Sequence, residues 1–139
     1  MKALAEAPQL LLHCAGIEYQ YLMSWDHYDD EWPNIAHQRP YKKLPVLVVD
    51  KTHEIAQGIA ILSYIEKLAG LNISDPIIAA KSDAVLQSDQ ELHAPLAPTI
   101  HFVVGDDFSS KRDAMTPFLS SRFDDFNRAL SSNGRMFFC

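Results

Sequence analysis

The sequence has little cysteine: only two of its 139 residues are cysteines, Cys14 and the C-terminal Cys139. Two cysteines cannot build the disulfide framework of a small secreted domain. No CxxC or Cys/His spacing indicates zinc, so we expect no metal cofactor. A protein of a reducing compartment is the natural interpretation.

Basic charge and long apolar runs are also scarce. Lys and Arg number 12 against 18 Asp and Glu, a formal net charge of -6, so no overall field attracts phosphate backbones. We therefore expect no nucleic-acid partner. Glu6 and Pro8 interrupt the stretch where a signal peptide needs an apolar core, and no later run is long enough to span a bilayer. We expect a cytoplasmic protein with no membrane partner.

The patterns that are present predict an α/β fold at the N-terminus. Pro8 and the apolar residues 10–16 predict a short helix that Gly16 ends. Apolar and polar residues then alternate over residues 17–23, which predicts a half-buried strand. Residues 24–40 have no clear period and are interpreted as a surface loop with at most one irregular turn.

The next segments predict a hairpin followed by a helix. The β-branched run over residues 44–50 predicts a buried strand that Pro45 opens, and residues 54–56 predict its hairpin partner. A broad apolar face over residues 59–68 predicts a helix that Gly70 ends.

The second half of the sequence predicts only helices. Residues 74–76, Ser-Asp-Pro, are a strong helix start, and the two prolines within residues 94–98 are expected to end that helix. Apolar residues spaced by three and four over 115–130 predict a last helix, with residues 133–134 as its C-cap.

The two ends of the predicted hairpin carry the most informative constellation. A proline that opens a buried strand is compatible with a cis peptide bond, which would turn the backbone N–H and C=O of Leu44 outward to pair with an extended peptide. The N–H groups at the helix start after Gln57 and Gly58 form a site for a carboxylate. Together they suit an anionic peptide. The alternative is a strand-edge proline and a strand-to-helix turn without a ligand.

Several stretches resemble the N-terminal domain of cytosolic glutathione transferases, most closely the sigma class with haematopoietic prostaglandin D synthases and S-crystallins. They are residues 10–19, 31–33, 43–50 and 56–65. The segment from Asp75 to Gly134 resembles the first part of that family's helical second domain. The resemblance implies an α/β thioredoxin-like, glutathione-binding domain over residues 1–72 and a partial all-helical domain over residues 74–139. It also implies a dimeric detoxification enzyme that conjugates glutathione, its co-substrate, to small electrophiles.

The resemblance assigns binding roles residue by residue. Trp32 and Lys43 match the side chains that hold the glycine carboxylate of glutathione, and Leu44 before Pro45 matches the residue whose backbone pairs with the cysteinyl unit. Gln57 matches a residue that helps to hold the γ-glutamyl end. The alternatives are a solvated charge for Lys43, a loop-to-core anchor for Trp32 and a simple turn residue for Gln57.

Two further positions concern the γ-glutamyl end. Asp83 resembles the acid that family members extend across the dimer interface toward the γ-glutamyl amine, and its alternative is a solvated charge on a helix. Gly58 stands where the family has a serine or threonine whose hydroxyl binds the γ-glutamyl carboxylate. The loss of that hydrogen bond to a charged group is worth roughly 1.5–3 kcal/mol.

The resemblance also implies an incomplete family member. Its members begin with a strand that presents a tyrosine to the glutathione thiol, whereas residues 1–4 here match the loop after that strand. None of the five tyrosines matches that role: Tyr19, Tyr21, Tyr28, Tyr41 and Tyr64. We expect a fragment without the first strand and with a truncated second domain, and identify no catalytic residue. Its conjugating activity would be impaired; the alternatives are a non-catalytic glutathione-binding or crystallin-like scaffold and an unstable product.

Overall fold

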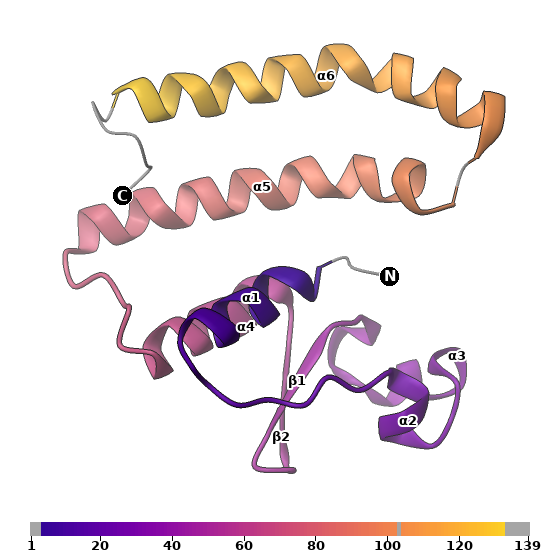
Figure 1. Cartoon of the computed structure of the whole chain (residues 1–139), viewed down its shortest axis with the longest axis vertical. Coiled ribbons are helices and arrows are strands. Elements are labelled where there is room, and N and C mark those ends of the chain that lie inside the picture. Colours follow the sequence, from indigo (N-terminus) through magenta and orange to yellow (C-terminus); the bar gives the residue numbers. More distant parts are fainter. Residues whose placement is uncertain (1–3, 103, 133–139) are drawn as a thin grey trace. The chain divides into compact units, whose positions relative to one another are not determined.

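The computed structural model describes residues 4–102 and 104–132. Contacts divide the chain into two units, Met1–Asn72 and Ile73–Cys139, and each unit is considered separately below. The first unit combines helices with a two-stranded sheet, and the second is a pair of long helices (Figure 1).

The core of the first unit forms where helix α1 (Glu6–Cys14) packs against helix α4 (Gly58–Leu68). Leu12 of α1 is 6% exposed, and Ile61 and Ile65 of α4 are 2% and 0% exposed. Partly buried apolar side chains surround this cluster: Leu11, Ile17, Leu47, Ile55 and Tyr64. The apolar face that predicted α4 is therefore a face that this helix buries.

Both helices end as the sequence predicts. Gly16 follows α1 with φ 66°, and the N–H of Ile17 donates to the carbonyl of Leu12 at 3.0 Å. Gly70 follows α4 with φ 68°. Glycine adopts this left-handed conformation without steric cost, which is why it ends helices.

The predicted hairpin is confirmed. Strand β1 (Val46–Val49) pairs antiparallel with strand β2 (His53–Ala56), and the register sets Val46 opposite Ala56. Leu47 and Ile55 face each other across this register and belong to the apolar shell of the core. The hairpin is thereby fixed to the helices by the same side chains that hold its strands together.

The strand predicted over residues 17–23 is wrong. The segment has no strand pairing, and its side chains are largely exposed, with Tyr19 at 44% and Tyr21 at 53%. A period-two pattern produces a strand only where a neighbouring strand pairs with its backbone. In the described part of the chain the sheet contains only β1 and β2.

The interpretation of residues 24–40 as a loop with at most one irregular turn is also wrong. The segment folds into short helices, the last of which extends two residues further: α2 (Ser24–Tyr28), α3 (Trp32–Ile35), and the 3-10 helices η1 (Ala36–Gln38) and η2 (Pro40–Lys42). Ile35 anchors the segment because it is only 7% exposed. Asp30 supports the start of α3 by accepting hydrogen bonds from Glu31 N and Asn34 Nδ2. Such short helices depend on these tertiary and local side-chain contacts, which have no period in the sequence.

In the second unit, helix α5 (Pro76–Phe102) begins as predicted but runs further. The Asp75 carboxylate caps it by accepting from the N–H groups of Ile77 and Ile78 at 2.8 and 3.1 Å. The expectation that residues 94–98 end this helix is wrong. Each proline removes one backbone donor, and a helix can bend past such a position when its other hydrogen bonds persist.

Helix α6 (Gly105–Ser132) begins ten residues before the predicted Met115 and contains Pro117 in its interior. None of its described side chains is buried. Arg122 on α6 forms an ion pair with Glu91 on α5 at 3.0 Å. The predicted C-cap at residues 133–134 lies outside the described residues. Among the described helices, none is both long and apolar enough to cross a membrane.

Candidate functional site

The hairpin register brings the two predicted backbone sites together. Because Val46 pairs with Ala56, the residues next to this last pair are residues 44–45 on one side and residues 57–58 on the other. Opposite residues of an antiparallel pair lie about 4.5–5.5 Å apart. The two segments that the sequence singled out therefore share one end of the hairpin.

The first of these segments contains Leu44. The Leu44–Pro45 peptide bond is cis, one of the two forms that the sequence left open. The backbone N–H and C=O of Leu44 make no hydrogen bond with other described residues, and its side chain is 44% exposed. Both backbone groups are thus open to a partner from outside the chain.

The second segment contains Gln57, whose backbone has φ 75° and ψ 120°. Its carbonyl accepts the hydrogen bond of the Ile61 N–H at 3.0 Å, so Gln57 forms the N-terminal boundary of α4. Positive φ in a residue other than glycine costs of order 1–3 kcal/mol and is concentrated at functional sites. The first N–H groups of α4 have no partner within the helix and carry its positive dipole end.

Gly58 is the first residue of α4, and it leaves space beside Gln57. A Cβ built on Gly58 would have the Leu4 carbonyl oxygen as its nearest neighbour, at 3.9 Å, an ordinary contact distance. The backbone therefore accepts a small side chain at this position.

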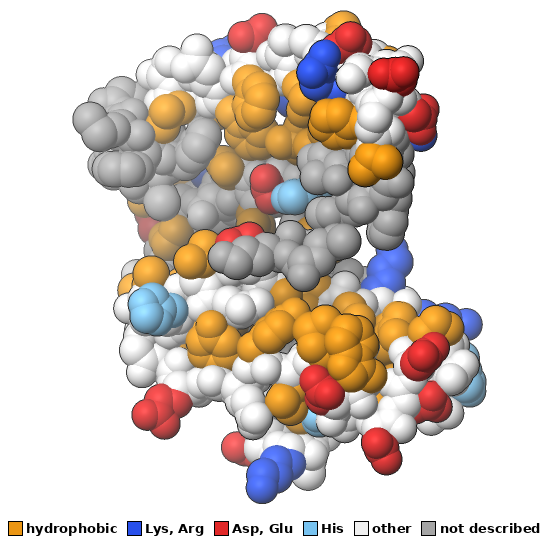
Figure 2. All heavy atoms as spheres, turned by 45° about the vertical axis from the view of Figure 1, so that its right-hand side comes forward, with side chains coloured by type: hydrophobic (Ala, Val, Ile, Leu, Met, Phe, Trp, Pro, Cys, Tyr) orange, Lys and Arg blue, Asp and Glu red, His pale blue; other side chains and the backbone are white. Residues whose placement is uncertain are grey.

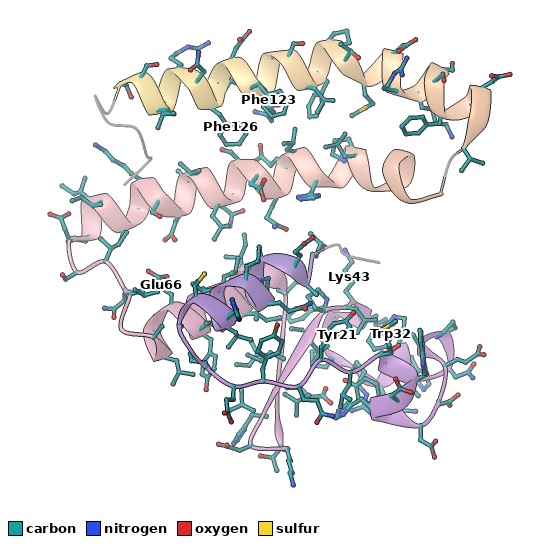
Figure 3. All side chains as sticks on the ribbon, in the orientation of Figure 1. Tyr21, Trp32, Lys43, Glu66, Phe123 and Phe126 are labelled. Carbon is teal, nitrogen blue, oxygen red and sulfur yellow. The ribbon has the colours of Figure 1, made fainter. Side chains whose placement is uncertain are left out.

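Trp32 and Lys43 project from the segment that connects α1 to β1 (Figure 3). Trp32 begins α3 and is half-buried, whereas Lys43 follows η2 and is exposed. Neither the indole N–H nor the Lys43 ammonium has a hydrogen bond or an ion pair within the described residues. Both can therefore bind a carboxylate.

A partly buried polar cluster that the sequence did not predict connects this segment to β2. Oε1 of Glu54 on β2 accepts a hydrogen bond from Arg39 Nη1 at 3.0 Å and one from the Tyr28 hydroxyl at 3.4 Å. The Arg39 guanidinium also lies 4.5 Å from the centre of the Tyr28 ring. We call Tyr28, Arg39 and Glu54 the Glu54 cluster. Its members are far apart in the sequence and follow no spacing rule, so nothing in the sequence could have identified them.

The surroundings of Tyr28 raise the pKa of its hydroxyl. Burial is the largest factor that raises the pKa of Tyr28, and the Glu54 carboxylate raises it further against the opposing effect of Arg39. The neutral phenol donates a hydrogen bond to the Glu54 carboxylate and carries no charge itself. Tyr28 also lies against Trp32, with 6.2 Å between ring centres.

Large hydrophobic side chains remain exposed around the first unit, and Figure 2 shows such side chains on its surface. They include Tyr19, Tyr21, Leu22, Trp25, Tyr41 and Leu44. Tyr41 and Leu44 flank Lys43 in sequence and are 71% and 44% exposed. Exposed apolar side chains within two residues of a lysine suit a ligand with both a charge and a hydrocarbon part.

Asp83, the remaining predicted site residue, lies on α5 in the second unit. It is exposed and has no ion pair among the described residues. Asp83 thus belongs to a different unit from the other predicted site residues. No group of three or more His, Cys, Asp or Glu in the described part of the chain is arranged to hold a metal ion.

Comparison with known proteins identifies the first unit. Residues 1–67 match the family model "Glutathione S-transferase, N-terminal domain". The whole chain is similar to probable glutathione S-transferase 6 of Caenorhabditis elegans, at 26% identity over 143 aligned positions that cover 99% of this chain and 67% of that protein. It also resembles hematopoietic prostaglandin D synthase of Gallus gallus, at 32% identity over 90 positions that cover 63% of this chain and 42% of that protein.

Solved structures show the same fold. A glutathione S-transferase from Ascaris lumbricoides aligns with a TM-score of 0.76 and 25% identity, covering 95% of this chain and 64% of that structure. The monomeric Na-GST-3 of Necator americanus aligns with the same TM-score and 24% identity, which supports the fold alone. The fold is thus a thioredoxin-like domain with a small sheet, followed by a helical region. The chain spans between 42% and 67% of the length of the curated relatives named above.

Proposed function

Because residues 1–67 match the glutathione S-transferase N-terminal domain, we propose that the chain belongs to that family and that its first unit binds glutathione at the end of the β1–β2 hairpin. The observation that carries this proposal is the register. With Val46 opposite Ala56, the open backbone of Leu44 and the start of α4 lie at one end of the hairpin. A tripeptide can then bind partly as an added strand and partly through its terminal charges.

Each part of glutathione has a partner of suitable chemistry. The N–H and C=O of Leu44, ahead of Pro45, pair with the backbone of the cysteinyl unit. Trp32 and Lys43 bind the glycine carboxylate, since a cation and an indole N–H both donate to oxygen. Gln57 and the first N–H groups of α4 bind the γ-glutamyl carboxylate, which the helix dipole also favours.

The γ-glutamyl end is the weaker part of the proposed site. Gly58 offers no hydroxyl, so the γ-glutamyl carboxylate lacks a hydrogen bond that a serine there would supply. We propose that Asp83 of a second copy meets the γ-glutamyl amine, which makes the active form a homodimer. A sigma-like class and a cytoplasmic location belong to the same proposal.

The proposed reaction is conjugation of glutathione to a small electrophile. The glutathione thiolate attacks the electrophilic carbon, a C–S bond forms, and the leaving group departs with its electron pair while the thiol proton passes to solvent. The thiol pKa must fall for this step to be fast near pH 7. No tyrosine of the described chain is assigned that role, and the Tyr28 hydroxyl is already engaged with Glu54. We therefore propose that this chain turns over slowly.

Calorimetric titration with glutathione and steady-state turnover of 1-chloro-2,4-dinitrobenzene test the proposal together. We expect measurable binding and a conjugation rate above the solution reaction but low for the family. Binding without any turnover would favour a non-catalytic glutathione-binding scaffold, which the glycine at position 58 also fits. Absence of both would contradict the proposed function for this chain. A Lys43→Ala variant, expected to bind roughly tenfold or more weakly, is the control for specific binding.

A further inference from the structure

The Glu54 cluster connects the separate parts of the proposed binding site. Glu54 lies on β2, three residues before Gln57, and its Oε1 accepts from both Arg39 and Tyr28. The side chains of Arg39 and Glu54 are 27% and 20% exposed, so the ion pair is mostly shielded from solvent. A shielded, charge-assisted pair holds its geometry better than an exposed one.

The first set of contacts connects Glu54 to Trp32 through Tyr28. The Tyr28 hydroxyl donates to Glu54 on β2 at 3.4 Å, and Trp32 lies against the Tyr28 ring with 41° between the planes. His27 also packs edge-on against the Tyr28 ring, with 4.6 Å between ring centres. The orientation of the Trp32 indole therefore depends on where Glu54 holds Tyr28.

The second set of contacts connects Glu54 to the turn before Lys43 through Arg39. Arg39 separates η1 from η2, and its carbonyl accepts the hydrogen bond of the Lys42 N–H at 3.2 Å, one residue before Lys43. Tyr41 and Lys42 have φ of 57° and 53°, so this turn is strained unless its surroundings hold it. The turn also contacts β2 through η2.

The position of Arg39 leaves one of its hydrogen-bond donors unsatisfied. Its Nε is buried and has no hydrogen-bond partner within the described residues. An unsatisfied buried donor is unfavourable, so the guanidinium is placed by its contacts with Glu54 and Tyr28.

From these contacts we propose that Glu54 is a positioning residue: through Tyr28 and Arg39 it holds Trp32 and Lys43 in register with residues 57–58. Glu54 thereby sets the affinity for glutathione without touching it. The effect on glutathione affinity rests on the proposed function. The ordering of the segment that carries Trp32 and Lys43 does not. Removal of the Glu54 carboxylate breaks its contacts with both Tyr28 and Arg39. Its replacement by an amide keeps an acceptor for both donors.

The affinity test compares Glu54→Ala, Glu54→Gln and Glu91→Ala in the full chain by calorimetry with glutathione. Glu91→Ala is the matched control because it breaks the 3.0 Å ion pair with Arg122 in the second unit. We expect Glu54→Ala to weaken binding roughly tenfold, Glu54→Gln to recover most of that loss, and Glu91→Ala to change nothing. In a Lys43→Ala background the effect of Glu54→Ala should shrink, because both changes disable the same contact. Unchanged binding in Glu54→Ala, or full additivity with Lys43→Ala, would overturn the proposal.

A second readout needs no ligand. In a Trp25→Phe background, Trp32 is the only tryptophan, and acrylamide quenching reports its accessibility. We expect Glu54→Ala and Tyr28→Phe to raise quenching of Trp32 at least twofold and Glu91→Ala to leave it unchanged. If Glu54→Ala does not fold by circular dichroism, Tyr28→Phe decides, since it removes only one hydroxyl. If the unsubstituted chain binds no glutathione, the proposed function fails, and quenching alone decides whether Glu54 orders the segment. Unchanged quenching in the folded variants would overturn it.

Discussion

The two units of the chain differ in how they bury apolar side chains. All residues of the described core belong to the first unit, where Ile65 is completely buried. In the second unit no described side chain of α6 is buried, and Phe123 and Ile77 are 58% and 68% exposed. A helix pair of this kind has little apolar burial to oppose its conformational entropy. The first unit is therefore the one that can hold a binding site rigidly.

The position of the proposed site follows from this difference. It lies where a hairpin fixed to the core meets the start of α4, so its backbone groups are carried by the best-packed elements. Sites on such elements keep their geometry better than sites on loops. In the segment that carries Trp32 and Lys43, Ile35 is the one described residue that is buried, which is why the Glu54 cluster matters.

The largest expected effect comes from removing core volume in the first unit. Ile65→Ala deletes side-chain atoms from a completely buried position and should lower the free energy of unfolding by about 2–5 kcal/mol. Both tryptophans, Trp25 and Trp32, lie in the first unit, so urea unfolding followed by tryptophan fluorescence reports on that unit.

Leu119→Ala on α6 is the matched change in the second unit. Leu119 is only partly buried, so its truncation should cost about 1 kcal/mol or less, measured by circular dichroism of the helices. An effect as large as that of Ile65→Ala would contradict the difference in burial between the units.

A smaller effect is expected on ligand binding at Gly58. Gly58→Ser adds a hydroxyl at a position with room for its Cβ, and one hydrogen bond to a carboxylate is worth roughly 1.5–3 kcal/mol. Glutathione affinity by calorimetry should therefore rise about tenfold or more. Gly58→Ala supplies the Cβ without the hydroxyl and should bind like the unsubstituted chain. Equal affinity of the serine and alanine variants would contradict the role of this position.

The smallest effects concern backbone conformation, and they should have opposite signs in the two units. Asp50 and Lys51 are the central residues of the turn that the Thr52 N–H closes by donating to the Val49 carbonyl at 3.1 Å, and their φ values of 50° and 61° favour glycine. Lys51→Gly should stabilise the first unit by about 0.5–1 kcal/mol. Gly105, the first residue of α6, has φ 66°, a conformation that strains any residue with a Cβ even where space is open. Gly105→Ala should therefore destabilise the second unit by about 1 kcal/mol. Thermal unfolding of both variants checks the signs, and a stabilising alanine at position 105 would contradict the argument.

Local sequence signals predicted the elements whose ends are marked by particular residues. Gly16 and Gly70 end their helices, Asp75 caps α5, and the β-branched run of β1 returns through a turn to β2. Each of these signals acts within a few residues, so it can be recognised without knowledge of the fold. Leu44 before the hairpin and residues 57–58 after it were singled out by local signals of the same kind.

The elements that were missed depend on partners that are distant in the sequence. The strand expected over residues 17–23 needs a neighbouring strand, and the short helices of residues 24–42 need Ile35 in the core and Asp30 at a helix start. The prolines near residue 95 were expected to stop α5, but the continuity of a long helix outweighs two missing donors. The Glu54 cluster was missed because its members meet only after folding.

Hydrogen exchange with and without glutathione tests the central claim most directly, because it locates the ligand on the chain. Glutathione should slow exchange at the Leu44 amide and at the first amides of α4, while exchange in α6 stays unchanged. The protected amides would then lie at the two sides of one hairpin end, as the register requires. Protection confined to the helices of the second unit, with none at Leu44 or after Gln57, would contradict the account.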